Sequence, residues 1–453
     1  MPYVKHKQKS INSTAVISLS FLGVILLGTL LLTLPFSSAS GSFTNPLTAF
    51  FTSVSATCVT GIVTVDTGSY WSTFGQIVIL IMIQTGGLGL VTLVSFFNFM
   101  LGKKMELSSV HLASASINSS GLGNVKSIIR VIVGVSLSCE LIGALLLMTS
   151  YVPKFGLKGV YISIYLSITS FCNAGFDIMG TVAEPFSGLS SLSNDPVTLI
   201  VIPLLVIAGG QGFFVWYDLI QYRNRKRFSF QTKLVTVCSL IFVLTGMLSV
   251  LVLEWNNPET LGGKSFVYKL ANSFFCSTTF RSSGFNTFGT ADMTPLTKII
   301  SLIYMIIGAA PGSTGGGIKI TTFVIAVMTV VCVMRNRQDT IIAGRKIKKS
   351  VVYEAFSIMF ILITLIILCS LFISFANENV SAADAVFEVT SALTTTGLST
   401  GILSECGLFS KVLLHLLMFI GRVGSVSLAL SFTSRDIRDD RNEIYPEGKL
   451  MVG

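Results

Sequence analysis

The sequence predicts an all-α polytopic membrane protein, built from four pseudo-symmetric repeats around one central pore. Three observations predict this fold. Only 11% of the 453 residues are charged, whereas soluble proteins carry roughly a quarter. The mean hydropathy is +0.77, and apolar runs of about 20 residues recur, long enough to cross a bilayer core. A short Ser/Thr-rich stretch ending in one glycine also occurs four times at nearly even spacing.

These four stretches end at glycines that are 114, 109 and 113 residues apart, and an aromatic residue stands ten positions before each glycine. They run over Phe51–Gly61, Tyr165–Gly175, Phe274–Gly284 and Phe387–Gly397. A glycine turn repeated in this way inside a membrane protein predicts a path lined by main-chain carbonyls. Two simpler interpretations remain: a repeated fold without a pore, and ordinary loop glycines that follow short helices.

Each repeat is expected to begin with a long apolar helix, at roughly 14–35, 127–152, 232–254 and 351–376. The stretch that ends at the repeated glycine follows, and 10–14 apolar residues are too few to span, so it fits a re-entrant helix. A second long helix closes each repeat, at roughly 73–101, 197–220, 296–333 and 408–432. The result is eight spanning helices and four re-entrant pore helices (M1–P–M2 repeats), divided at 1–101, 102–222, 223–335 and 336–453.

The distribution of positive charge predicts orientation. Of the 31 Lys and Arg residues, 21 lie in the N-terminus, 102–126, 222–233, 334–350 and the segment after Ser434. The positive-inside rule places these segments, and with them both termini, in the cytoplasm. The hairpins then face the outside. The net charge of +10 therefore indicates membrane topology, and we expect no nucleic-acid partner.

The first apolar run, Ala15–Leu34, follows Lys5, Lys7 and Lys9. A cleaved signal peptide is the alternative, but its apolar region is only about 7–15 residues long, so we expect a retained span. The eight cysteines form no C-x-x-C pair and the three histidines are far apart in sequence. We expect no disulfide framework, no side-chain metal site and no cofactor on this chain.

The closing segment of the third repeat is interrupted by five glycines and a proline within ten residues. These residues are Gly308, Ala309, Ala310, Pro311, Gly312, Ser313, Thr314, Gly315, Gly316 and Gly317. A helix does not continue through such a run, and a break at membrane depth must face a cavity. We expect an obstruction or hinge beneath the hairpins. A phosphate-binding loop is excluded, because Ile318 stands where that motif needs Lys.

A second glycine pattern, Gly-x-x-Gly, recurs in three closing helices at 86–89, 209–212 and 421–424. Small residues at this spacing usually let membrane helices pack closely, and close packing is the role we expect.

A cation that leaves water needs oxygen ligands in place of its hydration shell. Main-chain carbonyls supply them without net charge, glycine permits the unusual dihedrals that turn them inward, and the partly negative C-terminal ends of the short helices favour a cation. The candidate lining consists of Val59, Thr60, Gly61, Asn173, Ala174, Gly175, Ser282, Ser283, Gly284, Thr395, Thr396 and Gly397.

Two arginines near this path need an explanation. Arg422 lies about twelve residues, or roughly 18 Å, into its helix, where an unpaired charge costs several kcal/mol. It is either a structural residue bound to helix carbonyls, or a gate that hydrogen-bonds the freed carbonyls of the 308–317 loop. Arg281 stands three residues before Gly284, and Glu388 is the neutralising partner we expect for it.

Together these residues resemble the Trk/Ktr/HKT superfamily of potassium transporters, and within it the membrane subunits of bacterial Ktr systems. The resemblance covers almost the whole chain. It rests on the four quarters, on Thr60-Gly61, Ala174-Gly175, Ser283-Gly284 and Thr396-Gly397, on the 308–317 break, and on Phe419–Gly424. It implies a degenerate potassium-channel-like filter, and a gate formed by the loop and Arg422. Some plant relatives carry serine at the first glycine and favour sodium, so Gly61 matches the potassium type.

The resemblance also implies a homodimer on a cytoplasmic ring of RCK-type nucleotide-binding regulatory subunits. This chain has no such domain, so the regulatory subunit would be a separate protein, with the basic loops and the tail after Arg435 as contact surfaces. The function it predicts is K⁺ uptake across the plasma (inner) membrane. A Na⁺-coupled K⁺ symporter and a Na⁺-preferring pore are the alternatives.

Two other classes of protein are disfavoured. An intramembrane enzyme needs convergent catalytic side chains, and Glu140 is one of very few acidic residues within a span. A purely structural or receptor-like membrane protein would show no ion flux at all.

Overall fold

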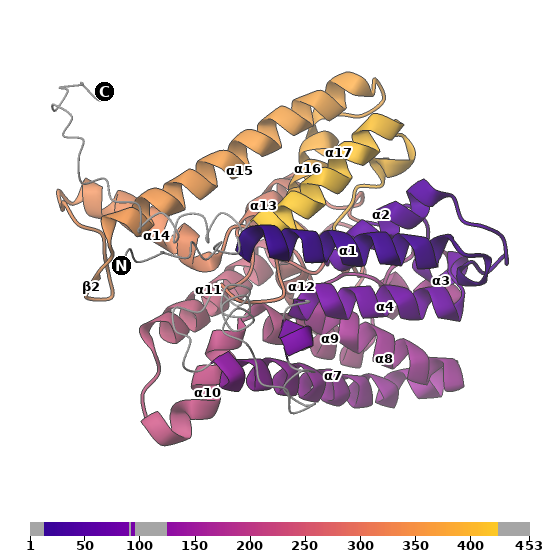
Figure 1. Ribbon diagram of the computed structural model, residues 1–453, viewed down its shortest axis with the longest axis horizontal. Coiled ribbons are helices and arrows are strands. Elements are labelled where there is room, and N and C mark those ends of the chain that lie inside the picture. The colour runs from indigo at the N-terminus through magenta and orange to yellow at the C-terminus, as the bar shows by residue number, and fades with distance from the viewer. Residues whose placement is uncertain (1–12, 90–91, 96–124, 425–453) are drawn as a thin grey trace, which may run out of the picture.

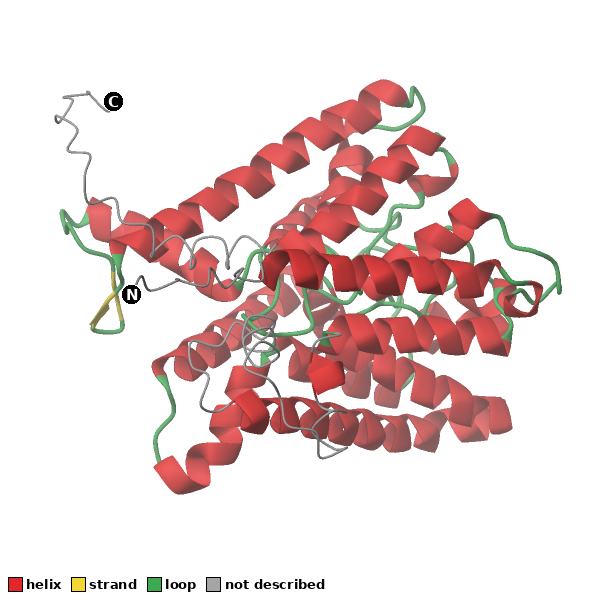
Figure 2. Ribbon diagram, viewed as in Figure 1, coloured by secondary structure: helices red, strands yellow, loops and turns green. Residues whose placement is uncertain are grey.

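The computed structural model describes residues 13–89, 92–95 and 125–424. This part is mainly helical, with one small antiparallel pair, β1 (Ile341–Ile342) and β2 (Arg345–Lys346), at one end of the molecule (Figure 2). Several segments used to predict orientation lie outside the described residues, namely the basic N-terminus, most of 102–126 and the C-terminal tail.

Four long helices match the four predicted leading helices. They are α1 (Ser13–Thr33), α7 (Val125–Phe155), α11 (Phe230–Leu253) and α15 (Lys349–Ala376). Among the described residues, these four are long and apolar enough to cross a membrane. On α1, Leu22, Leu26 and Leu30 are 41%, 51% and 68% exposed. Residues four apart share one helix face, so this apolar face suits contact with lipid.

Each long helix packs against the short helix that follows it: α2 (Pro46–Thr57), α8 (Leu157–Cys172), α12 (Phe266–Thr279) or α16 (Ala382–Thr394). The short helices are capped where the sequence suggests. Asn45, the residue before Pro46, accepts a hydrogen bond through its side chain from the Leu47 N–H. In the same way, the Ser381 side chain accepts from the Asp384 N–H. Both are favoured helix starts. The last turns of these helices bury mainly Ser, Thr and other small residues.

The closing segments complete a ring. They comprise α4 (Thr73–Leu88), α9 (Pro196–Gly210) with α10 (Phe213–Arg225), α13 (Pro295–Ile306) with α14 (Ile320–Met334), and α17 (Leu408–Phe419) with the π-helical η6 (Ile420–Gly424). Helix α4 packs on α8, α9 on α12, α13 on α16, and α17 on α2. Each closing helix thus contacts the short helix of the next segment, and the last contacts the first (Figure 1).

Short elements occur in the loops: α3 (Thr67–Tyr70) and the 3₁₀ turns η1 (Pro35–Ser37), η3 (Met179–Thr181), η4 (Ser190–Leu192) and η5 (Ile402–Ser404).

The prediction of one continuous helix over 197–220 is wrong. Helices α9 and α10 meet at 89°, because Gly212 adopts a φ of +86° that a helix does not allow. The freed main-chain groups are satisfied by the 308–317 loop: Phe213 N–H donates to Gly312 O (2.8 Å), and Ala310 N–H donates to Gly210 O (3.0 Å). The α9–α10 bend and the 308–317 loop therefore stabilise each other through main-chain hydrogen bonds.

Within the described residues, the other predicted closing helices are also interrupted. Helix α4 ends at Leu88, and α17 changes to π-helix at Ile420. The predicted break in the third segment occurs, with α13 ending at Ile306 and α14 beginning at Ile320. Residues 96–101 and 425–432 lie outside the described residues. Within the described part, four helices could span, or five if α9 and α10 count as one.

Candidate functional site

The four glycine turns share an unusual backbone. Gly61, Gly175, Gly284 and Gly397 have φ values of +92°, +68°, +68° and +93°, a region that L-residues avoid. In three turns the residue two positions earlier is also left-handed, namely Val59 (+58°), Asn173 (+60°) and Thr395 (+50°). A β-branched residue at positive φ is an outlier, and such strain persists only where surrounding contacts impose it. Ser282, at the equivalent place in the third turn, is not left-handed.

The N–H groups of these turns point back into the short helices. In three turns the residue before the glycine donates to a carbonyl five positions earlier: Thr60 to Ser55 (2.8 Å), Ala174 to Thr169 (2.8 Å) and Thr396 to Ser391 (2.9 Å). By contrast, the carbonyls of the twelve predicted lining residues accept no hydrogen bond from a main-chain N–H group of the described residues. Buried carbonyls are nearly always paired, so these are available to a ligand.

The turns meet one another in cyclic order. A Cβ added to Gly61 would lie 2.4 Å from the carbonyl oxygen of Ala174, and one added to Gly175 would lie 2.3 Å from that of Ser283. The ring continues from Gly284 to Thr396 O (2.7 Å) and closes from Gly397 to Thr60 O (2.0 Å). In each turn the carbonyl before the glycine therefore packs against a neighbouring glycine. Four segments more than 100 residues apart converge on one axis.

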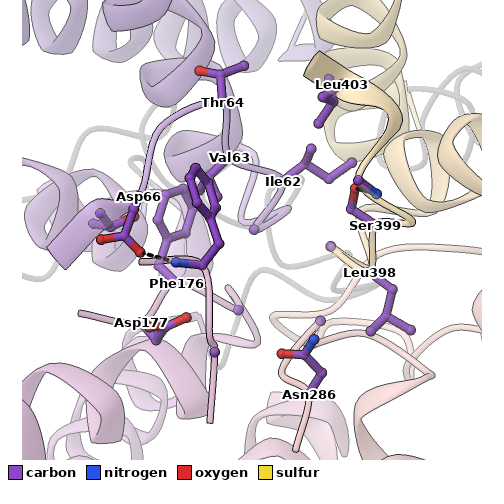
Figure 3. A pocket seen from close by; sticks show the side chains of 18 of the residues that line it. Ile62, Val63, Thr64, Asp66, Phe176, Asp177, Asn286, Leu398, Ser399 and Leu403 are labelled. Atoms are coloured by element: carbon purple, nitrogen blue, oxygen red, sulfur yellow. Dashed lines mark hydrogen bonds between the residues drawn. The ribbon is translucent and has the colours of Figure 1, made fainter. Parts of the chain in front are cut away.

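A cavity of about 410 Å³ opens on one side of this ring, lined by the four glycines and the segments that follow them. Asp66 and Asp177 lie on one wall, and Leu398 and Ser399 lie across from them (Figure 3). Asp66 is held in place by the N–H groups of Ser69 (2.7 Å) and Phe186 (2.9 Å). Burial raises the pKa of Asp177 to about 6, although the Met179 N–H acts against this.

On the other side of the ring lies the 308–317 loop. Thr314 Oγ1 accepts from the Asn173 side chain (2.6 Å). A Cβ on Gly315 would lie 2.9 Å from the Ser282 Cβ, and one on Gly316 would lie 2.1 Å from Thr395 Oγ1. The loop therefore contacts three of the four turns at the same level, two positions before the glycine. The loop therefore lies next to the ring, and its predicted role as an obstruction stays a prediction.

Two cationic side chains, those of Arg422 and Lys319, donate hydrogen bonds to carbonyls of the 308–317 loop. Arg422 donates to the carbonyls of Thr314 and Gly86, and to that of Gly87 (3.3 Å). Lys319 donates to Gly315 O (2.7 Å). The hydrogen bond from Arg422 to the loop was predicted. Helix carbonyls were the alternative partners for Arg422, and this contact occurs as well, since Gly86 and Gly87 lie in α4. The hydrogen bond of Lys319 was missed.

The three Gly-x-x-Gly patterns have two roles. As predicted, their first glycines permit close packing: a Cβ on Gly86, Gly209 or Gly421 would lie 1.8–2.0 Å from a carbonyl in the last turn of a short helix. In addition, each pattern marks a helix interruption, since Gly89 and Gly212 have positive φ and Gly421 and Gly424 lie in the π-helical η6. The interruptions free main-chain groups next to the ring.

The predicted pairing of Arg281 with Glu388 is wrong. Arg281 is buried and donates to Gly308 O (3.4 Å). Glu388 accepts instead from the Ser399 hydroxyl and from the Thr400 N–H (3.0 Å). Both residues are close in sequence to glycines of the repeated turns, but this proximity did not indicate which way the two side chains face.

Comparison with known proteins identifies the family. Residues 3–440 match the family described as "TrkH: Cation transport protein". The chain belongs to the TrkH family. It is 36% identical to the "Ktr system potassium uptake protein B" of Bacillus subtilis over 97% of this chain and 96% of the relative. It is 32% identical to the "Potassium/sodium uptake protein NtpJ" of Enterococcus hirae over 99% of both chains.

The fold of this TrkH-family member is also that of a solved relative. The crystal structure of the potassium transporter TrkH from Vibrio parahaemolyticus aligns with a TM-score of 0.70 over 96% of this chain and 87% of that chain, at 16% identity. The predicted superfamily is thus confirmed. As a member of a family of ion transporters, the chain is a polytopic membrane transporter and not an enzyme.

Proposed function

We propose that this chain takes up K⁺ across the plasma membrane through a gated filter of main-chain carbonyls. The observation that carries this proposal is the ring of four glycine turns, in which each carbonyl before a glycine packs on the next turn. The filter ligands are the carbonyls of 59–61, 173–175, 282–284 and 395–397, none of which accepts a hydrogen bond from a main-chain N–H group of the described residues. Uncharged oxygens of this kind hold a cation while still letting it leave.

The cyclic contacts between segments support four M1–P–M2 repeats with boundaries near 101, 222 and 335. In this proposal the four short helices are pore helices, and their C-terminal dipole ends face the ion. The closing helices are the second spanning helices of each repeat, interrupted beneath the filter.

The gate consists of the 308–317 loop with Arg422. The loop contacts three filter turns, and Arg422 joins it to the end of α4. A fixed cation next to the path opposes conduction. Opening therefore requires Arg422 and the loop to move together away from the axis.

The name of the Bacillus relative, a component of a "Ktr system", supports a separate regulatory partner. We propose that this partner is a cytoplasmic ring of RCK-type nucleotide-binding subunits, that the chain forms a homodimer, and that both termini are cytoplasmic. The basic segment around β2, with Arg345 and Lys346 exposed, is a candidate contact.

The second candidate function is Na⁺-coupled K⁺ symport or Na⁺-preferring conduction, which the "Potassium/sodium" name of the Enterococcus relative favours. Uptake of Rb⁺ and Na⁺ into proteoliposomes at clamped potential distinguishes the two. The K⁺ pore predicts Rb⁺ uptake without Na⁺, reduced Rb⁺ preference in Gly61→Ser, and higher uptake in Arg422→Ala. Rb⁺ uptake that requires a Na⁺ gradient supports symport, and absence of flux for either ion would refute both.

A further inference from the structure

Glu388 is an acidic side chain with no solvent exposure, located in α16 nine residues before Gly397. Its Oε1 accepts from the Ser399 hydroxyl and from the Thr400 N–H (3.0 Å). Its Oε2 is buried and has no hydrogen-bond partner among the described residues. The gate and the filter carbonyls do not explain this residue, and a buried carboxylate is costly enough to need an explanation.

The contacts of Glu388 lie just beyond the fourth filter turn. Ser399 is two residues after Gly397 and lines the cavity of about 410 Å³ next to the ring. On the inner side, Thr396 N–H donates to Ser391 O (2.9 Å) and Gly397 N–H to Ser391 Oγ (3.1 Å). The turn is therefore tied to α16 on both sides, by Ser391 before the glycine and by Glu388 after it.

The fourth turn alone has this attachment. Nine residues before the other three glycines stand Thr52, Leu166 and Phe275, none of which is an anion. The fourth turn is also the one that fits most tightly into the ring, since a Cβ on Gly397 would lie only 2.0 Å from Thr60 O. A small movement of this turn would displace the neighbouring carbonyl.

We propose that Glu388 is a positioning residue that determines ion selectivity by holding the fourth filter turn in register. This inference rests on the proposed transport function. Hydrogen bonds to a charged acceptor are shorter and stronger than neutral ones, so one carboxylate oxygen can hold both a hydroxyl and a main-chain N–H against α16. Without it, residues 398–401 separate from the pore helix, and the carbonyls of Thr395 and Thr396 lose their spacing.

The test compares Rb⁺ and Na⁺ uptake by Glu388→Ala, Glu388→Gln and Ser399→Ala in proteoliposomes. Glu388→Ala should lower the Rb⁺/Na⁺ uptake ratio about tenfold, the equivalent of one charge-assisted hydrogen bond, and raise the KM for Rb⁺. Glu388→Gln keeps an acceptor oxygen but loses the charge, so its ratio should lie between those of wild type and Glu388→Ala. Ser399→Ala should be intermediate, and the double variant Glu388→Ala with Ser399→Ala no worse than Glu388→Ala alone.

Glu405→Ala is the matched control, because Glu405 is an exposed acidic residue of the same outer segment, and its ratio should not change. A folded Glu388→Ala protein with the wild-type ratio would overturn the inference, and so would Gln proving as harmful as Ala. If Glu388→Ala does not fold, Ser399→Ala serves as the test instead. A wild-type Rb⁺/Na⁺ uptake ratio in Ser399→Ala would also overturn the inference. A wild-type protein that moves neither ion refutes the proposed transport function instead.

Discussion

The four glycines of the repeated turns offer a graded test of the proposed filter. In each Gly→Ala variant the new Cβ meets a carbonyl oxygen of the neighbouring turn, at 2.0 Å for Gly397, 2.3 Å for Gly175, 2.4 Å for Gly61 and 2.7 Å for Gly284. Real Cβ atoms essentially never come closer than 3.0 Å. The neighbouring carbonyl oxygen must therefore move by about 1.0 Å for Gly397 but by about 0.3 Å for Gly284, where the Cβ also meets the Cα and the carbonyl carbon of Gly397 at 2.8 Å.

All four substitutions share a second cost, because each glycine has positive φ, worth about 1–2 kcal/mol for an L-residue. Since this cost is common, differences between the variants report carbonyl displacement. We expect the Rb⁺/Na⁺ uptake ratio to fall most in Gly397→Ala, by about tenfold or 1.4 kcal/mol. Gly175→Ala and Gly61→Ala should follow, and Gly284→Ala should fall least.

The assay is paired Rb⁺ and Na⁺ uptake in proteoliposomes at clamped potential, normalised to folded protein. Gly23→Ala is the control, because a Cβ there has nothing within 4 Å. The reasoning fails if Gly284→Ala is as harmful as Gly397→Ala, or if the ratio is unchanged in all four variants.

Three further predictions concern the gate, the cavity next to the ring and stability. Arg422→Ala should raise basal Rb⁺ uptake about fivefold, because it removes the one hydrogen bond that joins Arg422 to the loop, at Thr314 O, worth about 1 kcal/mol. Arg422→Lys keeps the charge and should stay lower, and equal uptake in the two variants would contradict a charged gate. Because burial raises the pKa of Asp177 to about 6, its carboxylate loses its charge as pH falls from about 8 to about 5. The KM for Rb⁺ should therefore rise over that range in the wild type but not in Asp177→Asn, and a parallel rise in both would exclude Asp177. Asp195→Ala removes an acceptor of Lys154 (2.7 Å), of Ser150 (2.6 Å) and of the Thr198 N–H that caps α9 (2.8 Å). It should lower the melting temperature in detergent through the loss of about 1 kcal/mol from the cap alone, while uptake per folded molecule stays constant; an unchanged melting temperature would refute the capping role.

Local sequence signals predicted the parts of the fold that depend on local physics. The long helices follow from the length of the apolar runs, and the glycine turns follow from a repeat visible without any partner. The interruption at 308–317 was predictable for the same reason, because glycine and proline break a helix in any context.

The predictions were wrong where contacts between residues far apart in the sequence determine the structure. Residues 197–220 are apolar enough for one helix, and the bend at Gly212 is stabilised by Gly312, a hundred residues away. In the same way, Glu388 was assigned to Arg281 because both lie near filter glycines, whereas its partners are Ser399 and Thr400 in the following loop. The left-handed Val59 also had no local signal, since valine disfavours that conformation.

The third turn departs from its three counterparts, with Ser282 outside the left-handed region and Arg281 buried behind it. In a channel assembled from four identical subunits, a single codon change would alter every wall of the aperture at once. In the filter proposed for this chain, all four walls are encoded separately in one gene. Selection can therefore retune one side of the aperture while the other three preserve its width.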